Sequence, residues 1–218
     1  MTSSIDKQYS DLPTRSTLHL TRKFWHIGMG IFGLAIVELL SLSQAQAATT
    51  LLVISMVSLI TDLIRMRNDN FNEVVLKVFG PFMRKSEVHS LSGIPFFAFG
   101  TSMCLFFFDR DIAILSVLFL IFSDPISSLV GITYGKDKFL PNKSIQGSAA
   151  GFLVCFAITV AYSLYYHGVG VEVFLFAIAA GAIGSVSEMA SIIVDDNLTI
   201  PLISGAGLTV LNFVIPLF

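Results

Sequence analysis

Charged residues are scarce in this chain. They make up 13% of its 218 residues, whereas 54% are hydrophobic and the mean hydropathy is +0.80. Soluble domains carry about a quarter charged residues, so this composition excludes an ordinary soluble domain and predicts a polytopic membrane protein. The sequence also lacks the basic stripe that nucleic-acid-binding proteins use, so we expect no nucleic-acid partner.

Several catalytic and ligand-binding motifs are missing as well. The chain has no His-Glu-x-x-His and no Gly-x-Ser-x-Gly, the motifs of common metalloproteases and hydrolases. Its two cysteines, Cys104 and Cys155, lie in apolar runs without metal-ligand spacing, and we interpret them as small core residues. The N-terminus contains acidic residues and no apolar segment, which is typical of neither a signal peptide nor a transit peptide.

Long apolar runs are what the sequence does contain. Runs of about 17–22 residues recur, the length that crosses a bilayer as a helix. They predict an all-α bundle of about seven transmembrane helices, in a single catalytic domain at 22–218 that follows an N-terminal tail at 1–21. The fifth and seventh runs are either full spans or re-entrant segments. The expected spans are Trp25–Leu42, Ala45–Ile64, Leu91–Phe108, Ile112–Thr133, Gly147–Tyr166, Val171–Ile193 and Pro201–Leu217.

Lysine and arginine set the expected orientation, because they are enriched in cytosolic loops. With the N-terminus in the cytosol, only Arg110 of the 13 basic residues lies outside. We therefore expect a multi-pass integral membrane protein with a cytosolic tail. Its membrane would be the cell (inner) membrane of a prokaryote, or the endoplasmic reticulum or a plastid membrane of a eukaryote.

An amphipathic helix is expected between the second and third spans, over Asn70–Lys85. Its apolar residues repeat at i, i+3, i+4, i+7, i+8 and i+11 from Phe71, which places them on one helical face. Asn70 and Glu73 would form its capping box. A cytosolic helix of this kind lies in the membrane interface. It is either a connector packed on the bundle or a lip over which a lipid substrate enters.

Asp124 is an anomaly within its apolar run. A charge at bilayer depth costs several kcal/mol. Ser128, Gly131 and Gly135 follow it at helical spacing and would permit close helix packing. Packing by itself needs no carboxylate, so we predict that Asp124 serves a function with a cation or a proton.

A second acidic group follows the sixth predicted span. Glu188 and Asp195 lie on one helical side, and Pro201 is expected to start the next helix. Oxygen-rich side chains at a membrane-surface turn suit a hard cation such as Mg²⁺, although a solvated polar turn would look the same. The predicted metal ligands are Glu188, Asp195, Asp196 and Asn197.

The loop Tyr134–Gln146 combines glycine with three lysines. Gly135 would let the backbone approach a ligand, and Ser144 would cap the next helix, whose N-terminal amides attract anions. A Walker A phosphate loop is excluded, because the glycine spacing is wrong and no Ser or Thr follows the lysine. The lysines either bind phosphate or only follow the positive-inside pattern. They are Lys136, Lys138 and Lys143.

Two further polar groups lie at the cytosolic ends of spans. Arg22 and His26 are one helical turn apart with Lys23 between them, and they either hold phosphate or anchor the helix at the lipid headgroups. Asp62 lies three residues before Arg65, which favours a same-face ion pair. A site at these ends would meet cytosolic nucleotide and membrane lipid together.

Four stretches of the sequence carry a resemblance to a known family. They are Asp124-Pro-Ile-Ser-Ser-Leu-Val-Gly131-x3-Gly135-Lys136-x-Lys138 with Lys143-Ser144-x-x-Gly147-Ser148, Arg22-Lys23-x-x-His26, Asp62-x-x-Arg65, and Glu188 with Asp195-Asp196-Asn197-Leu198-Thr199-Ile200-Pro201. Together they resemble the polyprenol kinase family, which includes dolichol kinase, phytol kinase and CTP-dependent diacylglycerol kinase. The resemblance covers nearly the whole chain after residue 20. Two departures are Gln146 in place of the family's glutamate, and Pro-Ile-Ser-Ser after Asp124 in place of an alanine-rich run.

The resemblance implies a CTP-dependent kinase that transfers the γ-phosphate of CTP to the hydroxyl of a membrane lipid alcohol, with Mg²⁺ as cofactor. The alcohol would be a polyprenol or dolichol, phytol or diacylglycerol, and the sequence leaves this choice and the oligomeric state open. The expected catalytic residues are Asp124, Glu188 and Asp196. The expected nucleotide-binding residues are Gly131, Gly135, Lys136, Lys138, Lys143, Ser144, Gly147 and Ser148, and further phosphate contacts would come from Arg22, Lys23, His26, Asp62 and Arg65.

Two alternatives stand beside the kinase. The nucleotide segment also resembles phosphatidate cytidylyltransferase, but that enzyme ends in Pro-Gly-His-Gly-Gly, for which the C-terminal DDNLTIPLISGAG has no counterpart. A cation-coupled transporter would use the buried carboxylates as an ion path. It would need polar sites reachable from both faces, whereas the polar residues here cluster on one face.

Overall fold

The computed structural model describes residues 9–14, 17–140, 143–190 and 194–218, and within them the predicted all-α bundle is confirmed. The predicted end of the sixth span at Ile193 and much of the N-terminal tail lie outside the described residues. The elements are α2 (Leu20–Leu39), α3 (Gln44–Arg65), α4 (Asp69–Phe79), η1 (Gly80–Phe82), η2 (Lys85–Val88), α5 (Gly93–Phe107), α6 (Arg110–Leu118), η3 (Phe119–Ser123), α7 (Asp124–Thr133), β1 (Lys138–Leu140), β2 (Lys143–Ser144), α8 (Ile145–Tyr166), α9 (Val171–Ala190) and α10 (Asp196–Val214).

Five described helices are long and apolar enough to cross a membrane. They are α3, the continuous helix from α6 through α7 (Arg110–Thr133), α8, α9 and α10. The first and third predicted spans are helical too, as α2 and α5. With 15 residues, α5 is about 22 Å long, shorter than the hydrocarbon core of roughly 30 Å.

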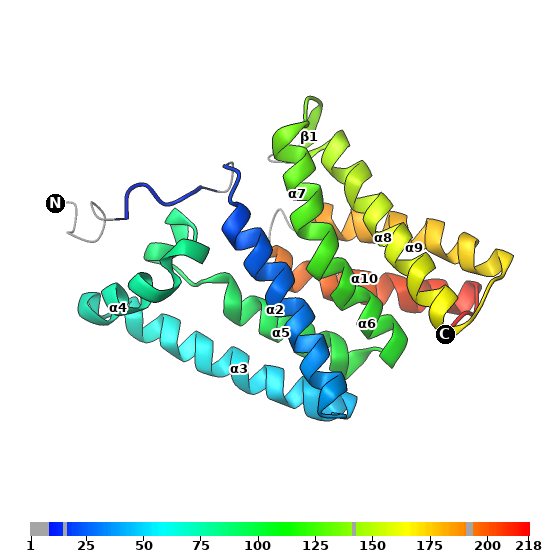
Figure 1. The fold of residues 1–218 in the computed structure, drawn as a ribbon, viewed down its shortest axis with the longest axis horizontal. Coiled ribbons are helices and arrows are strands. Elements are labelled where there is room, and N and C mark those ends of the chain that lie inside the picture. Colours follow the sequence, from blue (N-terminus) through cyan, green and yellow to red (C-terminus); the bar gives the residue numbers. More distant parts are fainter. Residues whose placement is uncertain (1–8, 15–16, 141–142, 191–193) are drawn as a thin grey trace.

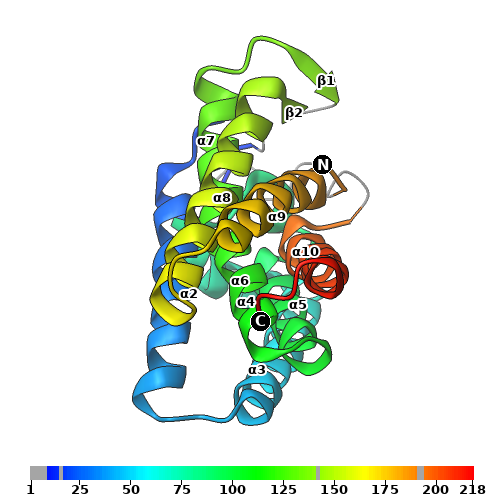
Figure 2. The same ribbon diagram turned by 90° about the vertical axis from the view of Figure 1, so that its right-hand side faces the viewer.

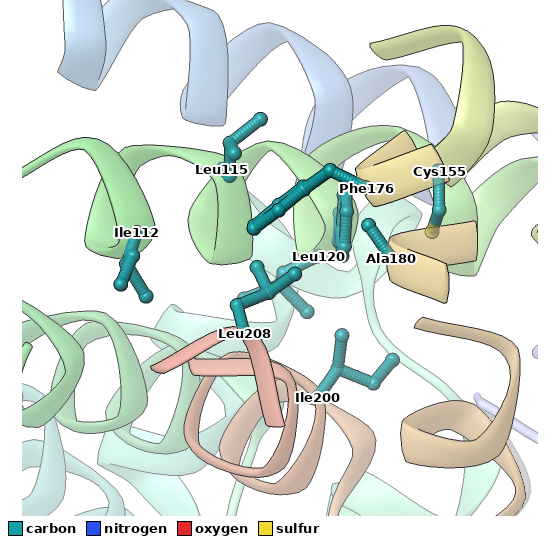
Figure 3. Close-up of a cluster of buried hydrophobic side chains, with 9 residues drawn as sticks. Ile112, Leu115, Leu120, Cys155, Phe176, Ala180, Ile200 and Leu208 are labelled. Atoms are coloured by element: carbon teal, nitrogen blue, oxygen red, sulfur yellow. The ribbon is translucent and has the colours of Figure 1, made fainter. Parts of the chain in front are cut away.

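The helices pack around a core between α6, α8, α9 and α10. Figure 1 shows α3 and α4 at one end of the molecule and α8 and α9 at the other, and Figure 2 shows the small antiparallel hairpin β1–β2 projecting beyond α7 and α8. Cys104 and Cys155 are both fully buried, as predicted for core residues. Core side chains from the four helices interdigitate in Figure 3, where Ile112, Leu115, Leu120, Cys155, Phe176, Ala180, Ile200 and Leu208 are labelled.

A π turn interrupts the fourth span immediately before Asp124. The turn covers Phe119–Ser123, and Asp124 begins α7. Proline has no N–H, so the turn before Pro125 cannot close with regular helical hydrogen bonds, and π turns occur often at functional sites. The carbonyl oxygen of Leu120 accepts a hydrogen bond from His26 Nε2 at 3.0 Å. His26 therefore fixes the irregular backbone from which Asp124 projects.

The amphipathic helix is present as α4, but the prediction that Asn70 caps it was wrong. Asn68 is the cap, and its side-chain oxygen accepts from the amide of Phe71 at 3.1 Å. Val74 and Val78 are exposed by 57% and 60%. An outward-facing apolar side is expected of a helix in the membrane interface.

The last helix also starts earlier than expected. The prediction that Pro201 begins it was wrong, because α10 starts at Asp196 and Pro201 lies inside it. The Asp195 side chain accepts from the amide of Asn197 at 3.1 Å and caps the helix. Proline cannot donate to the carbonyl of Asn197 four residues earlier. α5 packs closely against that carbonyl, since a Cβ added to Gly100 would overlap the oxygen.

Candidate active site

A cavity of about 330 Å³ joins the ends of helices that are far apart in the sequence. Its walls come from the segment before α2, α2 itself, α7, the hairpin, α8, α9 and the first residue of α10. Most of the predicted site residues line it. These are Arg22, Lys23, His26, Asp124, Gly131, Gly135, Lys138, Lys143, Ser144, Gly147, Ser148, Glu188 and Asp196.

Positive charge outweighs negative charge among the described residues that line this cavity. Its three carboxylates are Asp124, Glu188 and Asp196, each from a different helix. Asp124 is partly exposed to the cavity, and it interacts electrostatically with both of the other two. Five cationic side chains surround them, so the cavity suits an anion with several charges. The cations are Arg22, Lys23, Arg84, Lys138 and Lys143.

Lys143 and Glu188 form an ion pair across the cavity. The Lys143 Nζ lies 2.7 Å from the Glu188 Oε1, and both side chains are largely buried. Lys143 comes from β2 and Glu188 from the end of α9. Because an ion pair orients both partners, Glu188 holds the Lys143 ammonium at the cavity wall, where a phosphate would meet it.

The basic residues of α2 are each held by a neighbouring element. Arg22 donates to Glu87 Oε2 at 2.7 Å and to the carbonyl of Phe82 at 3.1 Å. Lys23 donates to Ser128 Oγ on α7 at 2.7 Å. These bonds fix α2 against the 84–88 segment and α7, and they leave part of each donor set for a ligand.

Small residues let α7 and α8 approach each other beside the cavity. The predicted cap is confirmed, since Ser144 Oγ accepts from the amide of Gly147 at 3.2 Å. A Cβ on Gly147 would lie 3.1 Å from the Cα of Gly131, and one on Gly135 would lie 2.5 Å from Ser144 Oγ. Gly135 thus lets two parts of the protein meet, in addition to lining the cavity.

Gly135→Ala is therefore expected to destabilise the protein by about 1–3 kcal/mol, the usual cost of overpacking. The measurement is thermal unfolding in detergent. Gly28→Ala is the matched control, because a Cβ at Gly28 meets nothing within 4 Å. Equal unfolding temperatures for the two variants would contradict the packing role of Gly135.

Asp62 and Arg65 do not line the cavity. Their predicted ion pair is present, with Arg65 Nε 2.5 Å from Asp62 Oδ1, and both residues are buried. Arg65 also donates to Asn72 Oδ1 at 3.2 Å and to the carbonyls of Val88 and Ser90. The pair therefore joins α3, α4 and the segment before α5, and the geometry gives it no phosphate to contact.

Lys136, Asp195 and Asn197 are also absent from the cavity lining. The Lys136 amide donates to the Gln146 side chain at 3.2 Å, within the loop. Asp195 caps α10 through Asn197, whose Nδ2 donates to Asp195 Oδ1 at 2.8 Å. Burial, and then the neighbouring Asp196 carboxylate, raise the pKa of Asp195 to about 6.

Arg84 and His19 are among the lining residues that the sequence-based prediction missed. Arg84 carries the same signal as Arg22, a basic residue that opens a predicted span. His19 had no signal, since it is an isolated histidine before the first span. Its Nε2 donates to the carbonyl of Pro81 at 2.9 Å, and its buried Nδ1 has no partner among the described residues. A buried ring nitrogen of this kind at a cavity wall is suited to bind a ligand.

The cavity fits a metal ion that enters together with phosphates. Among the described residues, no three His, Cys, Asp or Glu side chains converge closely enough to hold an ion by themselves. Asp124 and Asp196 do face the same cavity. Mg²⁺ is commonly held by one or two carboxylates and substrate phosphates, so these two residues suit it.

Comparisons with known proteins identify relatives of this chain. The chain is 30% identical over 197 residues to CTP-dependent diacylglycerol kinase 1 of Schizosaccharomyces pombe, which covers 85% of the chain and 89% of that protein. It is 27% identical over 206 residues to the Saccharomyces cerevisiae protein of the same name, covering 85% of the chain and 70% of that protein. The Eremothecium gossypii protein of that name is 33% identical over 135 residues, 61% of the chain, which spans 42% of that protein's length. No family model and no solved structure matches.

Proposed function

The chain belongs to the CTP-dependent diacylglycerol kinase family, as its motifs indicated, and from this premise we propose that it is a CTP-dependent lipid kinase acting on diacylglycerol. The bond between the γ-phosphorus and the β,γ-bridging oxygen of CTP breaks, and a bond from the lipid hydroxyl oxygen to that phosphorus forms. The products are a lipid phosphate and CDP. The proposal rests above all on one cavity that combines five cationic side chains with three carboxylates, each from a different membrane helix.

The cationic residues of the cavity would bind the triphosphate. Phosphoryl transfer depends on alignment and charge neutralisation more than on covalent help from the protein. Lys138 and Lys143 come from the hairpin, Arg22 and Lys23 from α2, and Arg84 from the segment before η2. The N-terminus of α8, with Gly147 and Ser148 in the lining, adds backbone amides that favour an anion.

In this proposal, Asp124 would receive the proton of the lipid hydroxyl. It starts α7 within a membrane span, so it meets the cavity on one side and apolar helices on the other. The neighbouring π turn and His26 hold its backbone in place. A base that removes the hydroxyl proton must lie within hydrogen-bonding distance of it, and a residue at this depth is accessible to a membrane-bound alcohol.

A magnesium ion would be held by Asp124 and Asp196 together with phosphate oxygens. When bound, it would neutralise charge on the phosphates during transfer. Glu188 instead orients Lys143, and Asp195 with Asn197 caps α10. Of the four predicted metal ligands, we therefore retain Asp196 as the direct ligand.

The decisive experiment uses the purified protein in detergent–lipid micelles with CTP labelled at the γ-phosphate. Diacylglycerol, phytol, a polyprenol and phosphatidate are supplied separately, and ATP, GTP and UTP replace CTP in parallel. Labelled phosphatidate from diacylglycerol and CTP is the expected product. Formation of a CMP-lipid from phosphatidate would favour the cytidylyltransferase. Cation flux in proteoliposomes without any labelled lipid would favour the transporter.

Asp196→Asn is expected to raise the Mg²⁺ concentration needed for half-maximal activity by at least about 10-fold, since loss of even an outer-sphere partner commonly costs that much. The measurement is a Mg²⁺ titration of phosphate transfer. Asp195→Asn is the matched control, because Asp195 caps α10 and does not line the cavity. A larger Mg²⁺ shift in the control than in Asp196→Asn would contradict the assignment.

A further inference from the structure

A second hollow lies beside the polar cavity, between the hairpin, α8 and α9. It measures about 340 Å³, and no charged side chain in the described part of the chain lines it. We call it the apolar groove. Two of its residues, Phe139 and Ile145, are exposed by 43% and 57%, so the groove opens on the surface. Its lining is Phe139, Ile145, Ala149, Phe152 and Met189 with Ser148 and Ser185.

The groove and the polar cavity share the same walls. In β1, Lys138 lines the cavity and Phe139 the groove, as expected for a strand whose successive side chains alternate. At the end of α9, Glu188 lines the cavity and Met189 the groove. Ser148 of α8 lines both hollows. The two hollows therefore adjoin at Ser148.

The groove has a fixed floor. Ser185 Oγ on α9 donates to the carbonyl of Ser148 on α8 at 3.1 Å. A Cβ on Gly181 would lie 3.0 Å from the ring of Phe152, so that ring packs directly on the α9 backbone. Because α8 and α9 are joined along this line, the hollow is a permanent feature of their surface and is ready to receive a ligand.

We propose that the apolar groove holds an acyl chain of the lipid acceptor and delivers its hydroxyl to the polar cavity past Ser148. This inference rests on the proposed lipid kinase function. A diacylglycerol keeps its chains in the bilayer while its hydroxyl must meet Asp124 in the polar cavity. Both α8 and α9 are long and apolar enough to cross a membrane, so a groove on their exposed side would be in contact with lipid. Continuity with the cavity at Ser148 selects the acceptor lipid as the occupant.

The test is photo-crosslinking in phosphatidylcholine proteoliposomes, with a diacylglycerol that carries a diazirine on one acyl chain. Labelling is expected on the peptide that contains Phe139 to Phe152 and on the one with Met189, and unlabelled diacylglycerol should compete it away. Ala149→Trp fills the groove and is expected to reduce this labelling and to raise the KM for diacylglycerol about 10-fold, with the KM for CTP unchanged. Leu153→Trp is the matched control, since Leu153 is 61% exposed on α8 and does not line the groove.

The possible results separate the groove from the kinase function. If the wild type transfers phosphate, and Ala149→Trp changes neither the labelling nor the KM for diacylglycerol, the proposed role of the groove is wrong and the proposed kinase function stands. Competed labelling in the groove without any lipid phosphate would support the lipid site and overturn the kinase. Labelling that is spread over all membrane helices and is insensitive to unlabelled diacylglycerol would contradict the proposal that the groove binds an acyl chain.

Discussion

Asp124→Asn is expected to lower the rate of phosphate transfer from CTP to diacylglycerol by about 10³-fold, within the range that a general base contributes. The variant keeps the shape and most of the hydrogen-bonding capacity of the side chain. It removes the negative charge that would accept the hydroxyl proton and help to hold a metal ion. The loss should therefore appear in kcat.

The same substitution should leave the fold intact. A carboxylate within a membrane span costs free energy, and replacing it by a neutral group of similar volume is often neutral or stabilising. The π turn at Phe119–Ser123 does not depend on the carboxylate, because Pro125 and the bond from His26 to Leu120 maintain it. Asp124→Asn is thus expected to elute and unfold like the wild type.

Asp111→Asn is the matched control for Asp124→Asn. Asp111 lies at the other end of the same continuous helix, where it accepts a hydrogen bond from Tyr162 Oη at 2.6 Å. Initial rates with labelled CTP, measured at saturating diacylglycerol, compare the two variants. A rate within threefold or so of wild type for Asp124→Asn would remove Asp124 from the chemistry, since a lost base costs far more.

Asp124 was predictable from sequence for a physical reason. A carboxylate in an apolar run is costly, so its presence indicates a function without any knowledge of the fold. The lysines of the hairpin and the small residues of α7 and α8 could also be predicted from local sequence. For the small residues the reason is that spacing determines which residues share a helical face. The sequence predicted only that these residues share one side of the membrane with Glu188 and Asp196. The residues that enclose the cavity could be identified only from the structure.

Local spacing could not separate a helix cap from a residue that lines the cavity. Asp195, Asp196 and Asn197 present the same oxygen-rich chemistry in sequence, yet Asp195 and Asn197 bond to each other, and Asp196 lines the cavity. The different positions of Asp195 and Asp196 depend on where α10 begins. The sequence-based prediction placed that start at Pro201, which was too late. His19 was missed for another reason, since its contact with Pro81 joins residues 62 positions apart.

Arg22 and Arg65 carry the same signal in sequence and have different surroundings in the structure. Both are arginines at the expected cytosolic end of a helix, and both form an ion pair with a carboxylate. Arg22 lines the polar cavity, whereas Arg65 is 1% exposed and donates only to protein groups among its recorded bonds. We therefore expect replacement of the two arginines to have different effects on stability and on the KM for CTP.

Arg65→Ala is expected to destabilise the protein by about 3–5 kcal/mol, the cost of breaking a buried ion pair by removing one partner. The truncation leaves Asp62 buried without its cation, and it removes one of two donors to the Val88 carbonyl and the donor recorded for the Ser90 carbonyl. Because that carboxylate also accepts from the amide and hydroxyl of Ser92, the segment before α5 should loosen as well. Unfolding in detergent, followed by circular dichroism, measures the loss.

Arg67→Ala is the matched control, because Arg67 is exposed two residues further along the chain. Arg65→Lys should recover little of the stability, since a lysine cannot reproduce the planar donor set that reaches Asp62, Asn72 and two carbonyls at once. If Arg65 contacted phosphate, Arg65→Ala would instead keep wild-type stability and raise the KM for CTP. Arg22→Ala is expected to raise the KM for CTP, because Arg22 lines the cavity, and also to lose stability, because its ion pair with Glu87 is largely buried.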